Sequence, residues 1–282
     1  MSTTELLPLG RDVGRSSTEG SLTPPALRAS FPKGEELFPS RKDEAWRYAD
    51  LDALKSVWDA LEAPRQIVVP AGEKHWHSLL PTSEPIQVRR AEIIVEPGAE
   101  LSIFALNTAS EYGRYEMDVE VREGANFTFD GANIGGGKAT QEIVTVVRHV
   151  EPNGTSRQYV RSVLAGKATG SYLGKVAVAR HAQKVDGEQS VKAMLLDRGA
   201  MANCKPELEI YADDVKCAHG ASVGELDPNQ LFYAMSRGLD PASAKALLLE
   251  GFVLQLWDDV PDKAQREALV EATRAALREV TK

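Results

Sequence analysis

The sequence is poor in cysteine and in uninterrupted apolar stretches. Its 282 residues include two cysteines, Cys204 and Cys217, which are too few for a disulfide-stabilised secreted domain. No stretch approaches the roughly 18 consecutive apolar residues of a membrane-spanning helix. Residues 1–5 lack the basic segment and the apolar stretch of a secretory leader. We therefore expect a soluble, cytoplasmic protein.

Clusters of positive charge and familiar catalytic motifs are also missing. The formal net charge is -8 and no long run of Lys and Arg occurs, so a nucleic-acid groove or a surface for anionic membranes is not expected. Residues 131–140 look like a phosphate-binding loop, but the glycine and hydroxyl positions are out of register with that motif, so we expect a turn. Nucleophile-elbow, zinc-protease and dinucleotide-binding patterns are absent. Protein or small-molecule partners fit better.

Three segments differ in pattern, and we treat them as three domains. Residues 1–62 read as a turn-rich loop around residues 16–25 and then one amphipathic helix from Glu44 to Leu61, whose aromatic residues are expected to pack. Residues 63–223 have short alternating strands broken by Gly, Pro, Asn and Asp. Residues 224–282 are helical, with cap-and-proline signals at Asp227-Pro228 and Asp240-Pro241. These helices fit either a cap over an open sheet end or a docking platform.

A short repeat marks the middle segment. The pattern apolar-x-x-Gly-Ala begins at Val95, Val121 and Leu196, and Val150 to Gly154 is a looser copy. Coils of this length bury their apolar face only by stacking, so the repeat favours a mainly β fold, the parallel β-helix, with an inner column of aliphatic residues and polar turns outside. A β-sandwich is the alternative, because it also has many short strands with frequent turns.

Cys217 and His219 are the candidate metal ligands. Residues two apart on an extended strand project from the same side, and a thiol and an imidazole both suit a soft or borderline metal. Zinc and iron–sulfur sites normally take four ligands, so the others must come from elsewhere in the chain or from a partner. The competing interpretation is a buried apolar thiol beside a hydrogen-bonded structural histidine.

The other histidines stand in no recognisable ligand pattern. His75 and His77 are expected to be surface residues, and the same caution applies to His149 and His181.

A longer, ordered set of residues resembles a known family. Its parts are Gly174-Lys175-Val176, residues 183–189, Leu195-Leu196, residues 205–220 and residues 231–238. Together they resemble the SufB/SufD family of iron–sulfur cluster assembly over roughly a third of the chain. Residues 42–48, Lys-Asp-Glu-Ala-Trp-Arg-Tyr, resemble the family's Lys-x-Glu-x-Trp-Arg-Tyr element. Because residues 217–220 have the form Cys-x-His-Gly rather than Cys-x-His-Glu, the resemblance is closer to the SufD member.

The resemblance implies a right-handed parallel β-helix between N- and C-terminal helical segments. It implies a non-catalytic scaffold subunit of a SufB–SufC–SufD complex, bound to a SufB-like paralogue through the β-helix. A SufC-like ABC ATPase, which hydrolyses the ATP, would bind the C-terminal helices. A homodimer is the alternative for the isolated chain.

The resemblance also implies where the metal chemistry takes place. Iron or a nascent iron–sulfur cluster would lie at the heterodimer interface near His219 and the neighbouring Cys217, with no cofactor held stably by the chain alone. Cys204 matches no family ligand, and the chain is shorter than typical members. Three residues after the strands, Tyr233, Ser236 and Arg237, are expected to clamp a helix to the solenoid rather than to catalyse.

Two further functions stay open at this point. Parallel β-helices also occur in polysaccharide-cleaving enzymes, whose sites cluster acids or bases on one face. The candidate acids here are Asp186, Glu188, Asp213 and Asp214, without a partner base nearby. The third function is an interaction scaffold with no metal role. Co-purification with an ATPase and a SufB-like paralogue would favour the assembly function, whereas sugar-cleaving activity would favour the enzyme.

Overall fold

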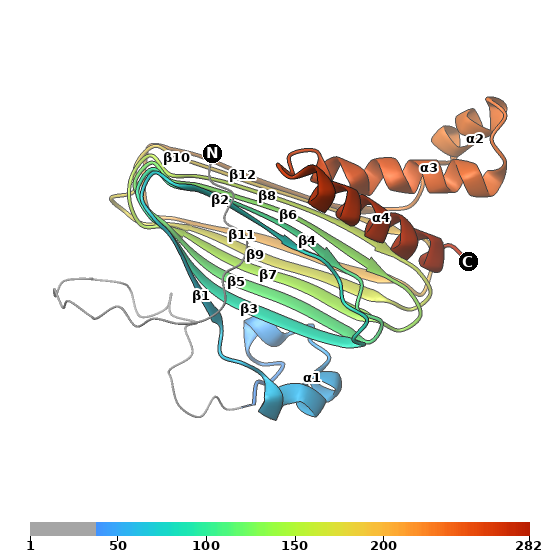
Figure 1. Cartoon of the computed structure of the whole chain (residues 1–282), viewed down its shortest axis with the longest axis horizontal. Coiled ribbons are helices and arrows are strands. Elements are labelled where there is room, and N and C mark those ends of the chain that lie inside the picture. Colours follow the sequence, from blue (N-terminus) through green and yellow to red (C-terminus); the bar gives the residue numbers. More distant parts are fainter. Residues whose placement is uncertain (1–37) are drawn as a thin grey trace. The chain divides into compact units, whose positions relative to one another are not determined.

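The computed structural model describes residues 38–282, and their centre is a parallel β-helix of two six-stranded sheets (Figure 1). Sheet A has the order β1-β3-β5-β7-β9-β11, and sheet B has the order β12-β10-β8-β6-β4-β2. The loop predicted around residues 16–25 lies outside the described residues. The strands are β1 (Arg65–Val69), β2 (Lys74–Leu79), β3 (Ile86–Val95), β4 (Glu100–Asn107), β5 (Tyr112–Val121), β6 (Asn126–Gly135), β7 (Thr140–His149), β8 (Thr155–Leu164), β9 (Thr169–Val178), β10 (Val185–Leu195), β11 (Met201–Ile210) and β12 (Val215–Gly224).

Successive strands alternate between the two sheets, so each coil adds one strand to each sheet. Every pairing between neighbouring strands is parallel. This topology confirms the β-helix and excludes the antiparallel sandwich. Residues that pair on neighbouring strands of one sheet are separated in sequence by one coil. This separation is 26 residues for Gln66 and Glu92, and 32 residues for Ser171 and Asn203. The growing coil length explains why the sequence repeat is irregular.

At Val95 and Val121 the repeat is a turn between a strand of sheet A and the next strand of sheet B, whereas the copy at Leu196 lies between β10 of sheet B and β11 of sheet A. Gly98 and Gly124 have φ of 66° and 61°, a region where glycine has no steric penalty. The following Ala99 and Ala125 are fully buried. Asn153 takes the same place in the looser copy with φ of 62°, because asparagine tolerates this conformation better than most residues.

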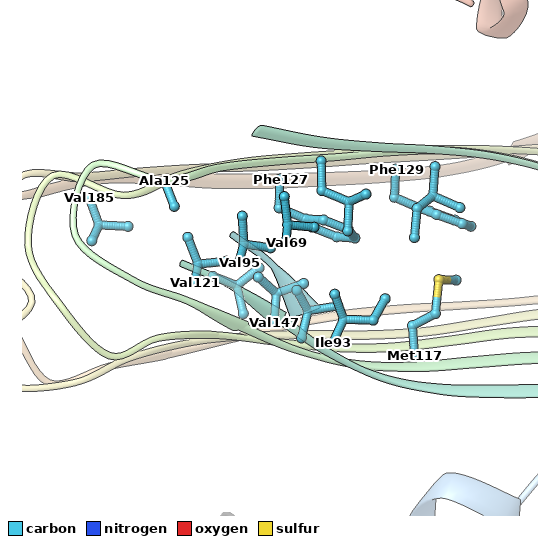
Figure 2. Close-up of a cluster of buried hydrophobic side chains, with 14 of the residues drawn as sticks. Val69, Ile93, Val95, Met117, Val121, Ala125, Phe127, Phe129, Val147 and Val185 are labelled. Carbon is cyan, nitrogen blue, oxygen red and sulfur yellow. The ribbon is translucent and has the colours of Figure 1, made fainter. Parts of the chain in front are cut away.

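Apolar side chains from both sheets fill the interior of the β-helix. Figure 2 shows aliphatic residues of sheet A, such as Val121 and Val147, facing Phe127 and Phe129 of sheet B. Residues on parallel strands keep their register from coil to coil, so like side chains stack in rows along the interior. A single coil would leave its apolar surface exposed to water, and stacking the coils buries that surface.

Three C-terminal helices follow the last strand: α2 (Pro228–Ser236), α3 (Pro241–Leu254) and α4 (Lys263–Val280), with a 3-10 turn η4 (Gln255–Trp257) between the last two. Asp227 and Asp240 cap α2 and α3, as the cap-and-proline signals predict. No helix within residues 38–282 is both long enough and apolar enough to cross a membrane.

The helices do not cap the open end of the β-helix, so that alternative is wrong. Instead α3 and α4 lie along the outer face of sheet B (Figure 1). Leu249, Val253 and Leu269 pack there against outward-facing residues of β4, β6 and β8, such as Phe104 and Ile134. The cause is the sequence of these strands, which places apolar residues on the outer as well as the inner face of sheet B.

The single helix predicted from Glu44 to Leu61 is also wrong. The segment forms three short pieces, η2 (Glu44–Trp46), α1 (Leu51–Val57) and η3 (Trp58–Ala60). The Asp50 carboxylate accepts hydrogen bonds from the backbone N–H groups of Asp52 and Ala53 and so starts a new helix at Leu51. The expectation that the aromatic residues pack is confirmed for Trp46, which is buried.

Candidate functional site: the open end of the β-helix

The last coil of the β-helix, formed by β11 and β12, has no further coil over it. Each of the two strands has a hydrogen-bonded neighbour on one side only, so each presents unpaired N–H and C=O groups along its free edge. Pro206 interrupts the edge of β11, because proline has no N–H to donate. The edge of β12 has no proline and is exposed over most of its length. It is the free sheet edge best suited to pairing with another chain.

Cys217 and His219 both lie on β12 and point toward the interior, as the sequence analysis predicts for residues two apart. Cys217 packs against the edge of the core and lies beside Gly187 of β10, where a Cβ atom would be 3.4 Å from its Sγ. Burial and the nearby Asp186 raise the pKa of the Cys217 thiol. The raised pKa favours the neutral thiol, which would have to lose its proton to bind a metal. His219 is exposed at the open end.

Cys204 joins these two residues on the last coil, a placement that the sequence analysis missed. It lies on β11 and points inward, in register with Tyr172 of β9. Burial raises the pKa of its thiol as well. The signal that could have found it is the alternation of β11, in which residues 204, 206 and 208 share the inner face.

The donors on this coil do not form a complete metal site by themselves. Within residues 38–282, no group of three or more His, Cys, Asp or Glu side chains is arranged to hold a metal ion. An iron–sulfur cluster is normally held by four ligands. Ligands from a second chain would have to complete any site at this open end.

A buried group of polar side chains lies beneath the last coil. Thr145 Oγ1 and Tyr172 Oη both donate to Gln158 Oε1, at 2.6 and 3.1 Å. Gln189 Nε2 donates in turn to Tyr172 Oη at 3.0 Å. Gln189 is the neighbour of His219 in the strand register. The interior next to the candidate ligands therefore contains a hydrogen-bonded polar group.

The opposite end of the β-helix differs in length and chemistry. Its strands β1 and β2 have 5 and 6 residues, compared with 10 in each of β11 and β12. Short edge strands with charged residues resist pairing with other chains. His75 contacts Glu73 at 2.8 Å there, and burial together with Arg65 and His75 lowers the pKa of His77. This end has fewer of the features expected of a docking edge.

A groove between α2 and α3 is the second candidate surface. It is lined by Asn229, Gln230, Tyr233, Ala234, Arg237, Leu239, Leu247 and Leu248. Leu247 is 57% exposed and the neighbouring Phe232 is 72% exposed. Apolar side chains that are this exposed and this close together are typical of a surface that binds another protein.

The expected clamp between α2 and the solenoid is wrong. Arg237 donates to Tyr233 Oη at 3.0 Å, and Ser236 Oγ donates to the Tyr233 carbonyl at 2.7 Å. These bonds lie within α2 and the residue after it. Tyr233 and Arg237 instead form one wall of the groove, because the turn at Gly238 folds α3 back against α2.

The N-terminal motif at residues 42–48 anchors its segment to the outer face of sheet A. Trp46 lies over the Arg114 guanidinium, 3.8 Å from the ring centroid. Arg114 is fully buried and pairs with Glu116 at 2.9 Å and Glu142 at 3.2 Å. Glu44 pairs with Lys205 of β11 and so links this segment to the last coil. The motif is structural in this chain.

The acids considered for sugar cleavage are divided between two places. Asp186 and Glu188 lie on the outer face of β10, whereas Asp213 and Asp214 lie in the turn before β12. Glu188 accepts a hydrogen bond from Tyr159 Oη at 3.0 Å. Glu188 is therefore engaged by a tyrosine hydroxyl rather than by a basic side chain.

Comparisons with known proteins give a matching family model and several curated relatives. Residues 77–252, which include the whole of β12, match the family model described as SUF system FeS cluster assembly, SufBD core domain. The iron–sulfur cluster assembly protein SufD of Escherichia coli (strain K12) is 36% identical over 115 residues, which are 41% of this chain and 27% of that protein. The protein of the same name in Bacillus subtilis (strain 168) is 30% identical over 137 residues, 49% of this chain and 31% of that protein.

A plant relative aligns over a longer part of the chain. Protein ABCI7, chloroplastic, of Arabidopsis thaliana is 28% identical over 208 residues, which are 72% of this chain and 43% of that protein. The chain thus spans less than half the length of these curated relatives. The family model nevertheless covers more than half of the chain and includes Cys217 and His219. The chain therefore belongs to the SufBD core family of the SUF system for iron–sulfur cluster assembly.

Proposed function

We propose that the chain is a SufD-like scaffold subunit whose open coil helps to assemble an iron–sulfur cluster together with a SufB-like paralogue. The observation that carries the proposal is the last coil. It combines a full-length strand whose outer edge is unpaired with an inward-facing thiol and imidazole, Cys217 and His219. Iron or the nascent cluster is the cargo of this site, and the chain alone keeps no stable cofactor.

The paralogue is proposed to complete the ligand set by docking on β12. Strand addition would pair the free backbone groups of β12 and place the partner's side chains next to His219. The exposed imidazole offers a ring nitrogen to iron, while Cys217 becomes a ligand when metal binding releases its proton. A second copy of this chain could use the same edge in a homodimer when the paralogue is absent.

The groove between α2 and α3 is proposed as the docking surface for a SufC-like ABC ATPase, which supplies the ATP hydrolysis. Its exposed Leu247, together with Leu248 and Leu239, offers an apolar surface for a partner side chain. Arg237 lies at the rim, where it can pair with an acidic residue of the partner. We place the complex in the cytoplasm.

The test is a comparison of His219→Ala with Ser222→Ala, which alters the same strand on its outer face. Both variants should change the free energy of unfolding by less than about 0.5 kcal/mol, because both positions are exposed. Both should still bind the paralogue and the ATPase. Cluster formation in the His219→Ala complex should fall by at least about tenfold, and the Ser222→Ala complex should behave as the wild type.

Unaltered cluster formation in a folded His219→Ala complex would leave a scaffold without a metal role. The same experiment on Cys217→Ala measures the contribution of the thiol. A Cys217→Ala protein that loses stability but keeps cluster formation would identify Cys217 as a packing residue.

A further inference from the structure

One in-register row of inner side chains on sheet B is polar over its last three strands. It consists of His77, Ile103, Phe129, Gln158, Gln189 and His219. Burying an amide costs free energy unless it is paired, and aliphatic residues would pack equally well at such positions. The two glutamines directly before His219 therefore require an explanation other than packing.

The hydrogen bonds around these glutamines determine which way the Gln189 amide points. Gln189 Nε2 donates to Tyr172 Oη at 3.0 Å, while that hydroxyl donates to Gln158 Oε1 at 3.1 Å. Gly174 makes room for the hydroxyl, because a Cβ atom there would lie 2.1 Å from the oxygen. The nitrogen of Gln189 is thus committed to Tyr172, and its oxygen is the free end.

The free oxygen is buried and has no hydrogen-bond partner. Gln189 is 1% exposed, and its Oε1 accepts no bond in the structure. Buried carbonyl oxygens are normally paired, so an unpaired one requires an explanation. The next side chain in the register is His219, one strand spacing of about 4.8 Å away. The imidazole N–H of His219 is a donor that the open end can provide to this oxygen.

We propose that Gln189 is a positioning residue for His219. Its Oε1 accepts a hydrogen bond from Nδ1–H of the imidazole. The other ring nitrogen, Nε2, then carries the free lone pair and faces the partner chain. The hydrogen bond made by one ring nitrogen determines which nitrogen is available to a metal. Tyr172 holds the amide in this orientation, and its hydroxyl proton can go either to Gln158 Oε1 or to Thr145 Oγ1. This inference rests on the proposed function of His219 as an iron ligand.

A competing arrangement is an amide ladder inside the β-helix. Gln158 Nε2 is also buried without a partner, and Gln158 is in register with Gln189. In that arrangement Gln158 donates to Gln189 Oε1 and the orientation of His219 does not depend on either residue. The two arrangements predict different effects of substitution on the tautomer of His219.

The experiment measures the tautomer of His219 by 15N NMR of the full chain at alkaline pH, where an ordinary imidazole is neutral. His219→Asn assigns the signal among the five histidines. The wild type should show predominantly the Nδ1–H form. Gln189→Met, which keeps the side-chain length but removes the acceptor, should shift the majority to the Nε2–H form. Gln189→Glu, which restores an acceptor oxygen, should retain Nδ1–H.

Gln158→Met is the matched control, because it removes an amide one coil further from His219. It should leave the tautomer unchanged. An unchanged tautomer in Gln189→Met, or an equal change in Gln158→Met, overturns the proposal. If Gln189→Met does not fold, the wild type decides, because a predominant Nε2–H form there is incompatible with the bond. Neither iron nor a partner is present in these measurements, so their outcome is independent of the test of cluster formation.

Discussion

Two buried titratable residues of the β-helix illustrate how removal from water moves pKa values in opposite directions. His149 faces the interior, where its Nε2 contacts Ser156 Oγ at 2.9 Å, and burial lowers its pKa from 6.5 to about 4. Asp130 faces the C-terminal helices, and burial raises its pKa to about 6 although Arg157 opposes the shift. Each neutral form is favoured, because burial penalises charge. Neither residue belongs to the open end, so both report on folding rather than on function.

The His149 shift predicts a specific dependence of stability on pH. The unfolded chain binds a proton at this histidine near pH 6.5, but the folded chain does so only near pH 4. The free energy of unfolding therefore falls as the pH is lowered through this window. His149→Gln removes the titration. Between pH 7.5 and pH 5, the wild type should lose about 2 kcal/mol more than the variant, from 1.36 kcal/mol for each pH unit below 6.5.

Urea unfolding of both proteins at the two pH values measures this difference. Asp130 acts with the opposite sign, because an acid with a raised pKa gains stability as the pH falls through about 6. Its contribution is common to both proteins and cancels in the comparison. A wild-type-to-variant gap that stays constant with pH would show that His149 is protonated in the folded protein.

At the scale of secondary-structure elements, the turns between coils depend on backbone conformation more than on contacts. Gly124 has φ of 61°, and a Cβ atom added there would meet nothing within 4 Å. Substitution of this glycine therefore changes the energy of the backbone and creates no clash. Lys184 holds a similar φ of 60° in a later turn of the same column. The chain tolerates this strain because hydrogen bonds from coil to coil fix the turn, such as the bond from Lys184 N to the Asp214 carbonyl.

Gly124→Ala should lower the free energy of unfolding by about 1–2 kcal/mol, the cost of a left-handed conformation for an L-residue. Gly251→Ala is the matched control, because Gly251 lies within α3 and also has nothing within 4 Å of a would-be Cβ. Alanine in a helix should raise the free energy of unfolding by up to about 1 kcal/mol. Thermal or urea unfolding measures the change in the free energy of unfolding for both variants. If the two changes have the same sign, the left-handed φ of Gly124 is not the cause of the loss of stability.

The same turns explain how much of the fold was predictable from the sequence. The pairs Gly98-Ala99 and Gly124-Ala125 fix a left-handed turn followed by a small buried residue, and the recurrence of the pattern predicts coils. The capping residues Asp227 and Asp240 are local signals, so the starts of α2 and α3 were predictable too. The packing of α3 and α4 on sheet B was not, because the outer apolar residues of β4 and β6 look like core residues in sequence alone.

The candidate site was predictable only in part. Cys217 and His219 are close in sequence, and strand alternation alone predicts that they share a face. Cys204 joins them only through the register between coils, and Gln189 only through the pairing of β10 with β12. Neither relation is visible before the number of residues in each coil is known. The changing coil length hides that number, because a regular spacing cannot be extrapolated along the chain.

At the scale of the described molecule, the two candidate surfaces are separate. The free edge of β12 has an exposed Val223, and the α2–α3 groove has an exposed Leu247. One helix of the groove, α3, also covers the outer face of sheet B together with α4. Deleting them would expose the apolar residues that they bury, so a truncation would test folding rather than docking. Point substitutions at exposed positions separate the two surfaces without this complication.

Leu247→Glu should abolish capture of the SufC-like ATPase and spare the SufB-like paralogue, and Val223→Glu should do the reverse. A carboxylate buried in either interface without a partner costs at least about 2 kcal/mol, or roughly 30-fold in Kd. Val68→Glu is the control, since Val68 is 56% exposed on β1 at the other end of the β-helix. It should bind both partners normally. Binding of the two purified partners to each variant measures these effects, and loss of both partners in any folded variant would mean that the surfaces are coupled. Because each substitution adds the same charge, only its location can explain a difference in the partner that is lost.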